Sequence, residues 1–386
     1  MTTLRKSIAI LFSLILVISL FSGCGSRIKE IDRFEMRNNM SIWDFRDEMG
    51  LGLNLGNTME AYNMVDGNAT SGAGSVGDNT ISDFEKCWGA QITTQEIIDG
   101  MCEAGFNTVR IPVYWGNGME DDGEFNIRPD LMDRVEEIVN YCLNDGLYVV
   151  VNMHHYDERL IKFHNVEDTV AAVGVLWTQI AEHFKDYGDH LIFEGFNEAL
   201  GNTPDGLNLN DNELYDFVNT MNQAFVDAVR ATGGNNANRV LIASGYWTNI
   251  DKTTSWRWHM PKDTVEDRLM VSVHYVDNMI YWSNQIGTDW WLDYSKAQCE
   301  LLKARFTDNG IPVFVGECTS SYADRIAQDA KVTESWKCLQ TILEMEVKDY
   351  GFIPVIWDTQ SDHSFYSRPD CAIADPNNAK VIKKLS

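Results

Sequence analysis

Short apolar runs recur along the chain at regular intervals, and each is followed by a polar segment. Their Val, Ile and aromatic residues, bounded by polar loops, are typical of strands. We therefore predict eight strands: Leu51–Thr58, Thr108–Trp115, Tyr148–His155, Leu191–Glu198, Val240–Trp247, Leu269–Val276, Pro312–Thr319 and Phe352–Thr359.

Helical patterns of apolar residues lie between these strands. The predicted helices are Thr94–Ala104, Asp130–Asn144, Val166–Tyr187, Asn212–Thr232, Trp291–Asp308 and Glu334–Tyr350. The first should begin with a capping box formed by Thr93 and Glu96. The segment Thr248–Arg268 has room for only a short helix. Strand and helix alternating in this way predict a single (β/α)8 barrel, an α/β fold with a parallel sheet inside and helices outside.

The first residues predict an export signal. Arg5 and Lys6 precede the apolar run Ile8–Phe21, which is short for a membrane span. Small residues then lead to Cys24, a pattern that resembles the lipid-attachment signal of bacterial lipoproteins, and an ordinary signal peptide with a chance cysteine is the alternative. The expected organisation is a signal peptide over residues 1–23, a polar tether over residues 24–35 and one barrel domain over residues 36–386. We therefore expect a secreted protein whose one membrane contact is a lipid anchor at Cys24.

Charge and cysteine usage narrow the range of partners. The sequence has 57 Asp and Glu against 31 Lys and Arg, so its surface repels phosphate backbones, and we predict no nucleic-acid partner. A neutral polysaccharide is compatible with this charge. Of the 8 cysteines, those other than Cys24 are scattered without CxxC spacing, which indicates mostly buried free thiols. We expect neither a metal nor a cofactor.

Polar side chains gather where the predicted strands end. Enzymes with this barrel build their active sites at the carboxyl ends of the strands, so polar residues there are candidates for function. Apolar strands tolerate such groups only near the rim, where water or a ligand satisfies them. The candidates are Arg110, His154, His155, Asn197, Glu198, His274, Glu317, Trp357 and Asp358.

Two of these candidates are glutamates at the ends of separate strands. Glu198 and Glu317 end runs that lie three strands apart, so their side chains should converge over the centre of the barrel. Paired carboxylates carry out glycoside hydrolysis, in which one donates a proton to the leaving oxygen while the other stays ionised. The alternative is a structural ion pair with Arg110 or a histidine, but placement at strand ends favours catalysis.

Several motifs in a fixed order carry a family resemblance. They are Gly52–Thr58, Thr108–Pro112, Asn152–His155, His190–Glu198 and Val273–Tyr275, with Glu317 at the end of a later strand. Together they resemble glycoside hydrolase family 5, the cellulase family A, and within it the endo-β-1,4-glucanase-like subfamily 4. The resemblance covers nearly the whole mature chain. It implies a retaining endo-β-1,4-glucanase that hydrolyses internal bonds of cellulose-type or mixed-linkage β-glucan, or of xyloglucan.

The resemblance also implies a role for each residue that matches the family. Glu198 would donate the proton and later activate water, and Glu317 would form the glycosyl-enzyme. Arg110 would hold the nucleophile ionised and aligned, and Asn197 would bind the 2-hydroxyl of the sugar. His274 would orient Glu198 and the sugar hydroxyls.

Other matching residues would bind the sugar. His154 would orient hydroxyls, and Trp357 would lie under the sugar at the cleavage point, because pyranose rings stack on aromatic faces. Trp115 would extend this floor. If His154 points inward, strand alternation turns His155 away, so His155 takes part only if the chain has left the sheet there.

One position departs from the family, which commonly has a tyrosine two residues after the histidine of the sixth strand. This chain has Val276 there. With His274 facing the site, alternation sends Tyr275 outward, so Tyr275 replaces the missing phenol only if a bulge or the strand end re-aims it. Tyr281, on the following loop, is the other candidate.

Three further readings of the sequence compete with this one. A metal-dependent barrel hydrolase would use His154, His155, His274 and the glutamates, but the first strand lacks the His-x-His that is common in such enzymes. A non-catalytic surface glycan-binding lipoprotein is disfavoured because both glutamates are present. A β-mannanase or a xylanase is the nearest competitor, because loops outside the motifs decide the substrate.

Overall fold

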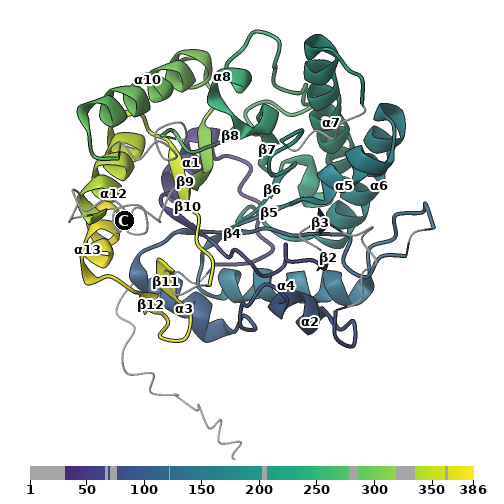
Figure 1. Cartoon of the computed structure of the whole chain (residues 1–386), viewed down its shortest axis with the longest axis horizontal. Helices are drawn as coiled ribbons and strands as arrows, with labels where there is room; N and C mark the ends of the chain where they lie inside the picture. The colour runs from purple at the N-terminus through teal and green to yellow at the C-terminus, as the bar shows by residue number, and fades with distance from the viewer. Residues whose placement is uncertain are drawn as a thin grey trace, which may run out of the picture.

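A closed barrel of eight parallel strands forms the centre of the molecule, with helices around it (Figure 1). The computed structural model describes residues 31–65, 68–69, 76–120, 122–201, 207–277, 286–318, 335–360 and 364–386. The order around the barrel is β1-β10-β9-β8-β7-β6-β5-β4. The strands are β1 Gly52–Asn54, β4 Thr108–Ile111, β5 Tyr148–Asn152, β6 Leu191–Glu194, β7 Leu241–Ser244, β8 Leu269–His274, β9 Val313–Cys318 and β10 Ile353–Ile356. The predicted single (β/α)8 barrel is confirmed.

The observed strands lie within the eight predicted runs, and all of them end earlier than predicted. The difference matters most for β6, which ends at Glu194, so that Glu198 lies four residues beyond the sheet. Glu317, by contrast, lies within β9.

The helices lie outside the barrel or cover its ends. They are α1 Ile42–Met49, α2 Ile81–Lys86, α3 Gln95–Ala104, α4 Pro129–Asn144, α5 Tyr156–Phe163, α6 Val166–His183, α7 Asp211–Ala231, α8 Ile250–Thr253, α10 Asp289–Arg305, α12 Ser335–Glu344 and α13 Pro376–Leu385. Short 3-10 and π turns are η1 Gly234–Ala237, η2 Tyr246–Thr248, η3 Thr307–Asn309 and η4 Met345–Asp349. Two small antiparallel pairs join β2 Met64–Val65 to β3 Asn68–Ala69 and β11 Tyr366–Ser367 to β12 Ala372–Ile373.

The predicted helices are found within a few residues of their expected bounds, with two differences. The last one divides into α12 and the π turn η4. The predicted capping box at the start of α3 is wrong, because the N-cap is Thr94 and its side chain makes no capping hydrogen bond. Thr93 is buried instead, and its backbone N–H donates to Oε1 of Glu85 at 2.7 Å. The segment expected to hold only a short helix contains η2 and α8.

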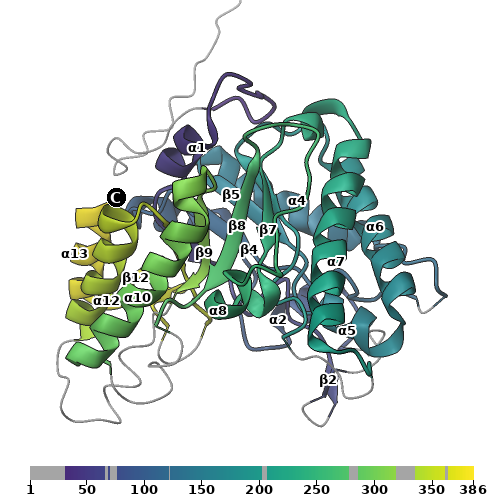
Figure 2. The same cartoon turned by 90° about the horizontal axis from the view of Figure 1, so that it is seen from above.

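The interior of the barrel changes from apolar to polar along its axis. At the amino ends of the strands, α1 closes the barrel, and it packs on a cluster of buried side chains: Val150, Ile192, Ile242, Met270, Phe314, Ile353 and Val355. Figure 2 shows α1 at this end of the strands and β2 at the opposite end. Toward the carboxyl ends the buried residues on the strands include Asn54, Arg110, Asn152, Glu194 and Ser272. The fold therefore concentrates polar groups at one mouth of the barrel.

The first described residues are bound to the barrel. Gly188 donates its backbone N–H to the carbonyl of Arg33 at 2.7 Å, and the Arg33 guanidinium donates to Asn140 at 2.7 Å. The expected tether thus meets the domain before residue 35, whereas the predicted signal peptide and Cys24 lie outside the described residues. In the described ranges, no helix is long and apolar enough to span a membrane. The cysteines of those ranges are free, and most are buried, as predicted.

Candidate active site

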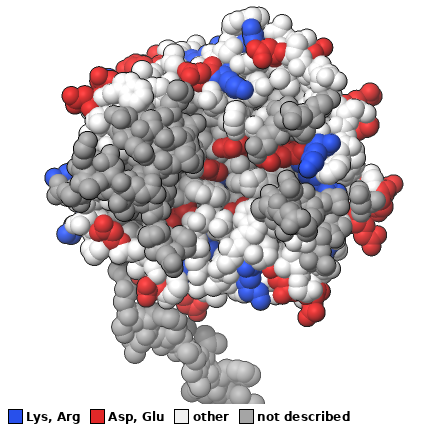
Figure 3. All heavy atoms as spheres, in the orientation of Figure 1, with Lys and Arg blue, Asp and Glu red and all other residues white. Residues whose placement is uncertain are grey.

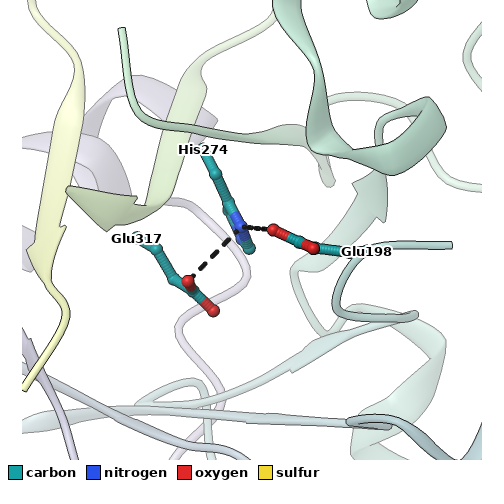
Figure 4. A group of neighbouring side chains, drawn as sticks. All are labelled: Glu198, His274 and Glu317. Carbon is teal, nitrogen blue, oxygen red and sulfur yellow. Dashed lines mark hydrogen bonds and ion pairs between the residues drawn. The ribbon is translucent and has the colours of Figure 1, made fainter. Parts of the chain in front are cut away.

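Glu198, His274 and Glu317 converge at the carboxyl end of the barrel (Figure 4). Nδ1 of His274 lies 3.1 Å from Oε1 of Glu198 and 3.7 Å from Oε2 of Glu317. One oxygen of Glu198 and one oxygen of Glu317 are within 4.8 Å of each other. Figure 3 views this face of the molecule and shows acidic side chains gathered in a hollow near its middle.

Glu317 is held by three side chains from two neighbouring segments. Its side chain is 8% exposed, and its Oε1 accepts a hydrogen bond from Arg110 at 3.4 Å. Its Oε2 accepts a hydrogen bond from the hydroxyl of Tyr275 at 3.0 Å. With His274 on the remaining side, the direction of the carboxylate is fixed by partners on β4 and around the end of β8.

Glu198 lies outside the sheet and is more accessible, with 29% of its side chain exposed. Besides His274, its partner is Trp247, whose indole N–H donates to Oε2 at 3.3 Å. Burial alone would raise the pKa of Glu198, but the hydrogen bond and charge of His274 outweigh burial and hold this pKa below its usual value. Trp247 acts in the same direction. In the unliganded site these contacts favour the ionised form of Glu198.

Arg110 is fully buried and connects four polar side chains. Its Nε donates to Glu194 at 2.7 Å, its Nη1 to Asn54 at 2.9 Å, and its Nη2 to Asn197 at 2.9 Å. Burial alone would lower the pKa of Arg110, but the charges of Glu194 and then Glu317 raise it. The sequence analysis missed Asn54 and Glu194. The signal that could have found Glu194 is a charged residue within an otherwise apolar strand.

His154 and Trp357 lie together at the ends of β5 and β10. Their rings are stacked, with centroids 5.8 Å apart and planes at 18°. Burial holds the pKa of His154 well below its ordinary value, and the charges of His155, Arg110 and His274 act in the same direction. His154 is therefore neutral and suited to exchange hydrogen bonds with hydroxyl groups.

His155 contacts His154 edge-on, with ring centroids 4.3 Å apart, and lies in a group of aromatic rings. β5 ends at Asn152, and the positive φ of 59° at His155 turns the chain into α5, which begins directly after it. The ring contacts Tyr62 edge-on at 5.8 Å and Trp88 at 6.1 Å. Burial would lower the pKa of His155, but the carboxylate of Glu158, 3.5 Å from its Nδ1, raises it. His155 thus lies beside the two glutamates' site, among partly exposed aromatic side chains.

The regular strand alternation expected at Tyr275 is wrong, and the alternative expectation, in which a bulge or the strand end re-aims this residue, is confirmed. The register of β8 against β9 shifts between Val273 and His274, and Tyr275 has a positive φ of 45°. These two irregularities break the alternation of the strand and bring the hydroxyl of Tyr275 to Glu317. Val276 is buried and only 1% exposed. Tyr281, the other candidate for this contact, lies outside the described residues.

The expectation that Trp115 extends the sugar-binding floor is also wrong. Its side chain is 0% exposed, and its indole N–H donates to the carbonyl of Asn152 at 2.8 Å. A side chain without accessible surface cannot stack on a sugar, so Trp115 is a packing residue of the barrel. Trp247, which the sequence analysis did not assign to the site, is 42% exposed and contacts Glu198.

The same site contains possible metal ligands. Among the residues whose placement is described, one group of three could hold a metal ion: Glu198, His274 and Glu317. Their chemistry suits zinc, which binds carboxylate oxygen and imidazole nitrogen. The guanidinium of Arg110, at 3.4 Å from Glu317, would repel such a cation. Arg110 thus acts against a cation that the two carboxylates would attract.

Two carboxylates less than 5 Å apart at the carboxyl mouth of a (β/α)8 barrel are features of a glycoside hydrolase. The sequence profile of a family described as Cellulase (glycosyl hydrolase family 5) matches residues 68–363. The chain belongs to this family, and the predicted resemblance is confirmed.

Individual relatives agree with this assignment. Endoglucanase B of Ruminococcus albus is 34% identical over 343 residues, which are 87% of this chain and 78% of the relative. A xyloglucan-specific endo-β-1,4-glucanase of Bacteroides ovatus is 30% identical over 361 residues, 87% of this chain and 68% of the relative. A solved GH5-4 broad specificity endoglucanase of Ruminococcus champanellensis with bound cellotriose superposes with a TM-score of 0.76 at 28% identity. The superposition covers 90% of this chain and 99% of that structure.

Proposed function

We propose that the protein is a retaining endo-β-1,4-glucanase that hydrolyses internal bonds of cellulose-type or mixed-linkage β-glucan. The observation that carries retention is the separation of at most 4.8 Å between oxygens of Glu198 and Glu317. Retaining glycosidases hold their two carboxyl groups about 5–5.5 Å apart, whereas inverting enzymes leave about 6.5–9.5 Å for a water molecule. The separation in this barrel fits direct attack by one of the carboxylates.

The proposed reaction has two steps. In the first, an oxygen of Glu317 bonds to the anomeric carbon while Glu198 protonates the leaving oxygen, and the glycosidic bond breaks. In the second, Glu198 takes a proton from a water molecule whose oxygen bonds to the anomeric carbon and releases Glu317. Two displacements at one carbon restore its original configuration. Glu317 is suited to the attack because its carboxylate is fixed, and Glu198 because water can reach it.

His274 supports Glu198 in both of its protonation states. When Glu198 is ionised, Nδ1–H of His274 donates to it across 3.1 Å. When Glu198 carries its proton, the same contact works in reverse if the ring proton lies on Nε2, an atom with no hydrogen-bond partner among the described residues. The low pKa of Glu198 in the free site suits the second step. A bound sugar that excludes solvent from Glu198 raises this pKa for the first step.

The remaining site residues take positioning and binding roles in this proposal. Arg110 and Tyr275 hold Glu317 by its two oxygens. Asn197, whose oxygen is fixed by Arg110, presents its amide N–H to the sugar 2-hydroxyl. Trp357 forms the floor under the sugar, and His154 hydrogen-bonds its hydroxyls.

His155 would bind a sugar further along the cleft. It lies next to Tyr62 and Trp88, whose partly exposed rings can stack on a pyranose face.

A panel of polysaccharides tests the function directly. The purified protein should release reducing ends from carboxymethyl cellulose, barley β-glucan and xyloglucan, and viscosity should fall early because cuts are internal. Both the relative that is named xyloglucan-specific and the structure with cellotriose favour these β-glucans. Cleavage of xylan or mannan alone would overturn the substrate assignment. Binding without cleavage of any polymer would favour the glycan-binding lipoprotein.

The metal-dependent mechanism has its own test. Activity should survive prolonged incubation with a chelator followed by desalting, because both displacement steps use carboxylates alone. Loss of activity that added zinc restores would favour the metal mechanism and assign Glu198, His274 and Glu317 as ligands.

We also propose that the protein is exported and anchored by a lipid on Cys24, after removal of residues 1–23, with residues 24–35 as a tether to the barrel. The apolar run Ile8–Phe21 and the small residues before Cys24 support this. Full-length protein made in a bacterial host should partition with membranes, and Cys24→Ser should release or mislocalise it. Unchanged partition of Cys24→Ser would favour the ordinary signal peptide.

A further inference from the structure

We propose that Glu194 is a positioning residue for catalysis. It fixes the Arg110 guanidinium and balances its charge. Arg110 can then orient Glu317 by a hydrogen bond without forming a tight ion pair with it. This inference rests on the proposed retaining mechanism. Glu194 itself contacts neither of the two site glutamates through any hydrogen bond within the described residues. It acts through Arg110.

The carboxylate of Glu194 lies inside the barrel and is bound from three other strands. It is 0% exposed. Its Oε2 accepts hydrogen bonds from Arg110 at 2.7 Å and from Asn152 at 3.1 Å, and its Oε1 accepts one from Ser272 at 2.7 Å. Donors on β4, β5 and β8 therefore leave Glu194 a single orientation.

The backbone next to Glu317 leaves room for Glu194. A Cβ atom added at Gly316 would lie 3.2 Å from Oε1 of Glu194 and 3.1 Å from Oγ of Ser272, which is tighter than ordinary contact. Glycine at this position lets Glu194 reach the centre of the barrel beneath the reacting carboxylate. A side chain at position 316 would press on Glu194, on Ser272 and on Nε2 of His274, at 3.2 Å, so glycine there leaves space for these three groups.

Fixing one edge of Arg110 fixes the other two nitrogens. The guanidinium is planar, so the bond from Nε to Glu194 determines where Nη1 and Nη2 point. Nη1 reaches Asn54 and Glu317, and Nη2 reaches Asn197. The orientation of the proposed nucleophile and of the proposed 2-hydroxyl ligand therefore depends on Glu194.

The distances show which carboxylate balances Arg110. Nε lies 2.7 Å from Glu194, whereas Nη1 lies 3.4 Å from Glu317. A buried guanidinium requires a counter-charge, and leaving one unpaired is costly. If Glu317 were its only partner, Arg110 would draw Glu317 into a tight ion pair and weaken the attack. In the glycosyl-enzyme Glu317 becomes a neutral ester, and Glu194 then keeps Arg110 paired.

The substitution Glu194→Gln tests this, because glutamine keeps the shape and removes the charge. In the variant Arg110 has only Glu317 as a charged partner, so the ionised form of Glu317 is favoured more strongly than in the wild type. The acidic limb of the kcat/KM profile should move to lower pH. The value of kcat should fall by at least about tenfold while KM changes by less than about threefold. The other charged or titratable groups that face Glu317, namely His274, Tyr275 and Glu198, are unchanged.

Glu85→Gln is the matched control. Glu85 is 1% exposed and pairs with Arg134 at 3.0 Å, between α2 and α4, and its hydrogen bonds within the described residues go to Arg134 and Thr93 and not to a residue of the proposed site. This variant loses a buried ion pair of the same kind, so its melting temperature should fall, but its kcat and pH profile should not change. The contrast separates a loss of stability from an effect on the reaction.

The outcomes decide between positioning and packing. A folded Glu194→Gln with the kcat and acidic limb of the wild type would show that Glu194 only fills space. If Glu194→Gln does not fold, Ser272→Ala keeps the charge of Glu194 but removes one of the hydrogen bonds that orient it, so kcat should fall with little change in KM. An unchanged kcat there overturns the proposal. Inactive wild-type enzyme would instead overturn the glucanase function itself.

Discussion

The two proposed catalytic carboxylates come from opposite walls of the barrel that are built differently. Along β4, β5 and β6 the strands pair residue for residue, without a shift in register. Along β8, β9 and β10 the register shifts twice, between Val273 and His274 and between Pro354 and Ile356. Glu317 lies within a strand of the irregular wall, and Glu198 lies beyond the end of a strand of the regular wall.

This difference matches what the two steps demand. A nucleophile needs one oxygen held at one position, and the strand with its cross-strand donors provides this for Glu317. A general acid and base must exchange protons with the substrate and with water, and the loop leaves Glu198 29% exposed between two ring N–H groups. The irregular strand therefore fixes the carboxylate of Glu317. The position of Glu198 beyond the end of its strand lets substrate and water reach its carboxylate.

The largest expected effect is that of Glu317→Ala. The variant should lose kcat by a factor on the order of 10⁵ because nothing replaces the nucleophile. It should still fold, because Arg110 keeps Glu194 as its partner. Sodium azide should restore turnover of an aryl β-cellobioside with a good leaving group, and the product should be the α-configured glycosyl azide.

The stereochemistry of that product is the control. In Glu198→Ala the same reagent should give the β-configured azide, because azide then attacks the glycosyl-enzyme from the face that water uses. An α product from the Glu198 variant and a β product from the Glu317 variant would exchange the two roles. Equal kcat in wild type and Glu317→Ala would remove Glu317 from the mechanism altogether.

Glu198→Gln should have the next largest effect, and it should depend on the leaving group. On polysaccharide the loss should be about 10²- to 10⁴-fold, because the leaving oxygen needs a proton. With an activated aryl cellobioside the first step needs no proton, so glycosyl-enzyme should accumulate. Mass spectrometry of the quenched protein would detect the adduct on Glu317. Equal impairment of both substrates, with no adduct, would contradict the acid and base role.

The strand ends of both walls could be predicted from the sequence, but the direction of a side chain in the irregular wall could not. Short apolar runs located the strands, and polar residues at their ends located Arg110, Asn197, Glu198, His274 and Glu317 at one mouth. Alternation failed at Tyr275, because a shift in register and a positive φ change which side chain faces the site. A bulge depends on how two strands pair, and a single strand's pattern of residues does not contain that information.

The roles of buried polar residues were also not predicted from the sequence. Glu194 and Asn54 lie inside the barrel, where their partners come from strands distant in the sequence. A pattern of residues along one strand shows a polar group but not the partner that satisfies it. The error at Trp115 was the opposite one, a site role predicted for a residue that has none. This aromatic residue near a strand end was expected to contact sugar, but it is fully buried. Exposure depends on the loops that cover a position.

Tyr275→Phe tests the irregular wall by removing one hydrogen-bond donor to Glu317. A hydroxyl that donates to a carboxylate stabilises the ionised form, so its loss should move the acidic limb of kcat/KM to higher pH. The value of kcat should fall roughly tenfold to a hundredfold, as for other hydrogen bonds to charged groups. Tyr350→Phe is the control, because it deletes a 2.8 Å tyrosine bond to Glu300 outside the site.

Val276→Tyr should not restore what Tyr275→Phe removes. Val276 is 1% exposed, so the larger side chain overpacks the core and lowers the melting temperature. A nearly silent Tyr275→Phe together with an active Val276→Tyr would show that the strand alternates regularly and that the observed bulge is absent in solution.

The smallest expected effect is that of Trp247→Phe, on the loop side of the comparison. The phenylalanine keeps an aromatic face for the sugar but loses the indole N–H that lies 3.3 Å from Oε2 of Glu198. This donor lowers the pKa of Glu198, so its loss raises the pKa, and Glu198 then keeps its proton to higher pH. The basic limb of kcat/KM should therefore move upward while kcat changes by no more than about fivefold, because a long contact at an exposed rim contributes little. The acidic limb should stay in place, since Trp247 donates to Glu198 and not to Glu317.

Trp256→Phe is the matched control, because Trp256 is 82% exposed on the same connection between β7 and β8, and both limbs should be unchanged. A basic limb that stays fixed in Trp247→Phe would show that His274 and His155, without Trp247, set the protonation of Glu198.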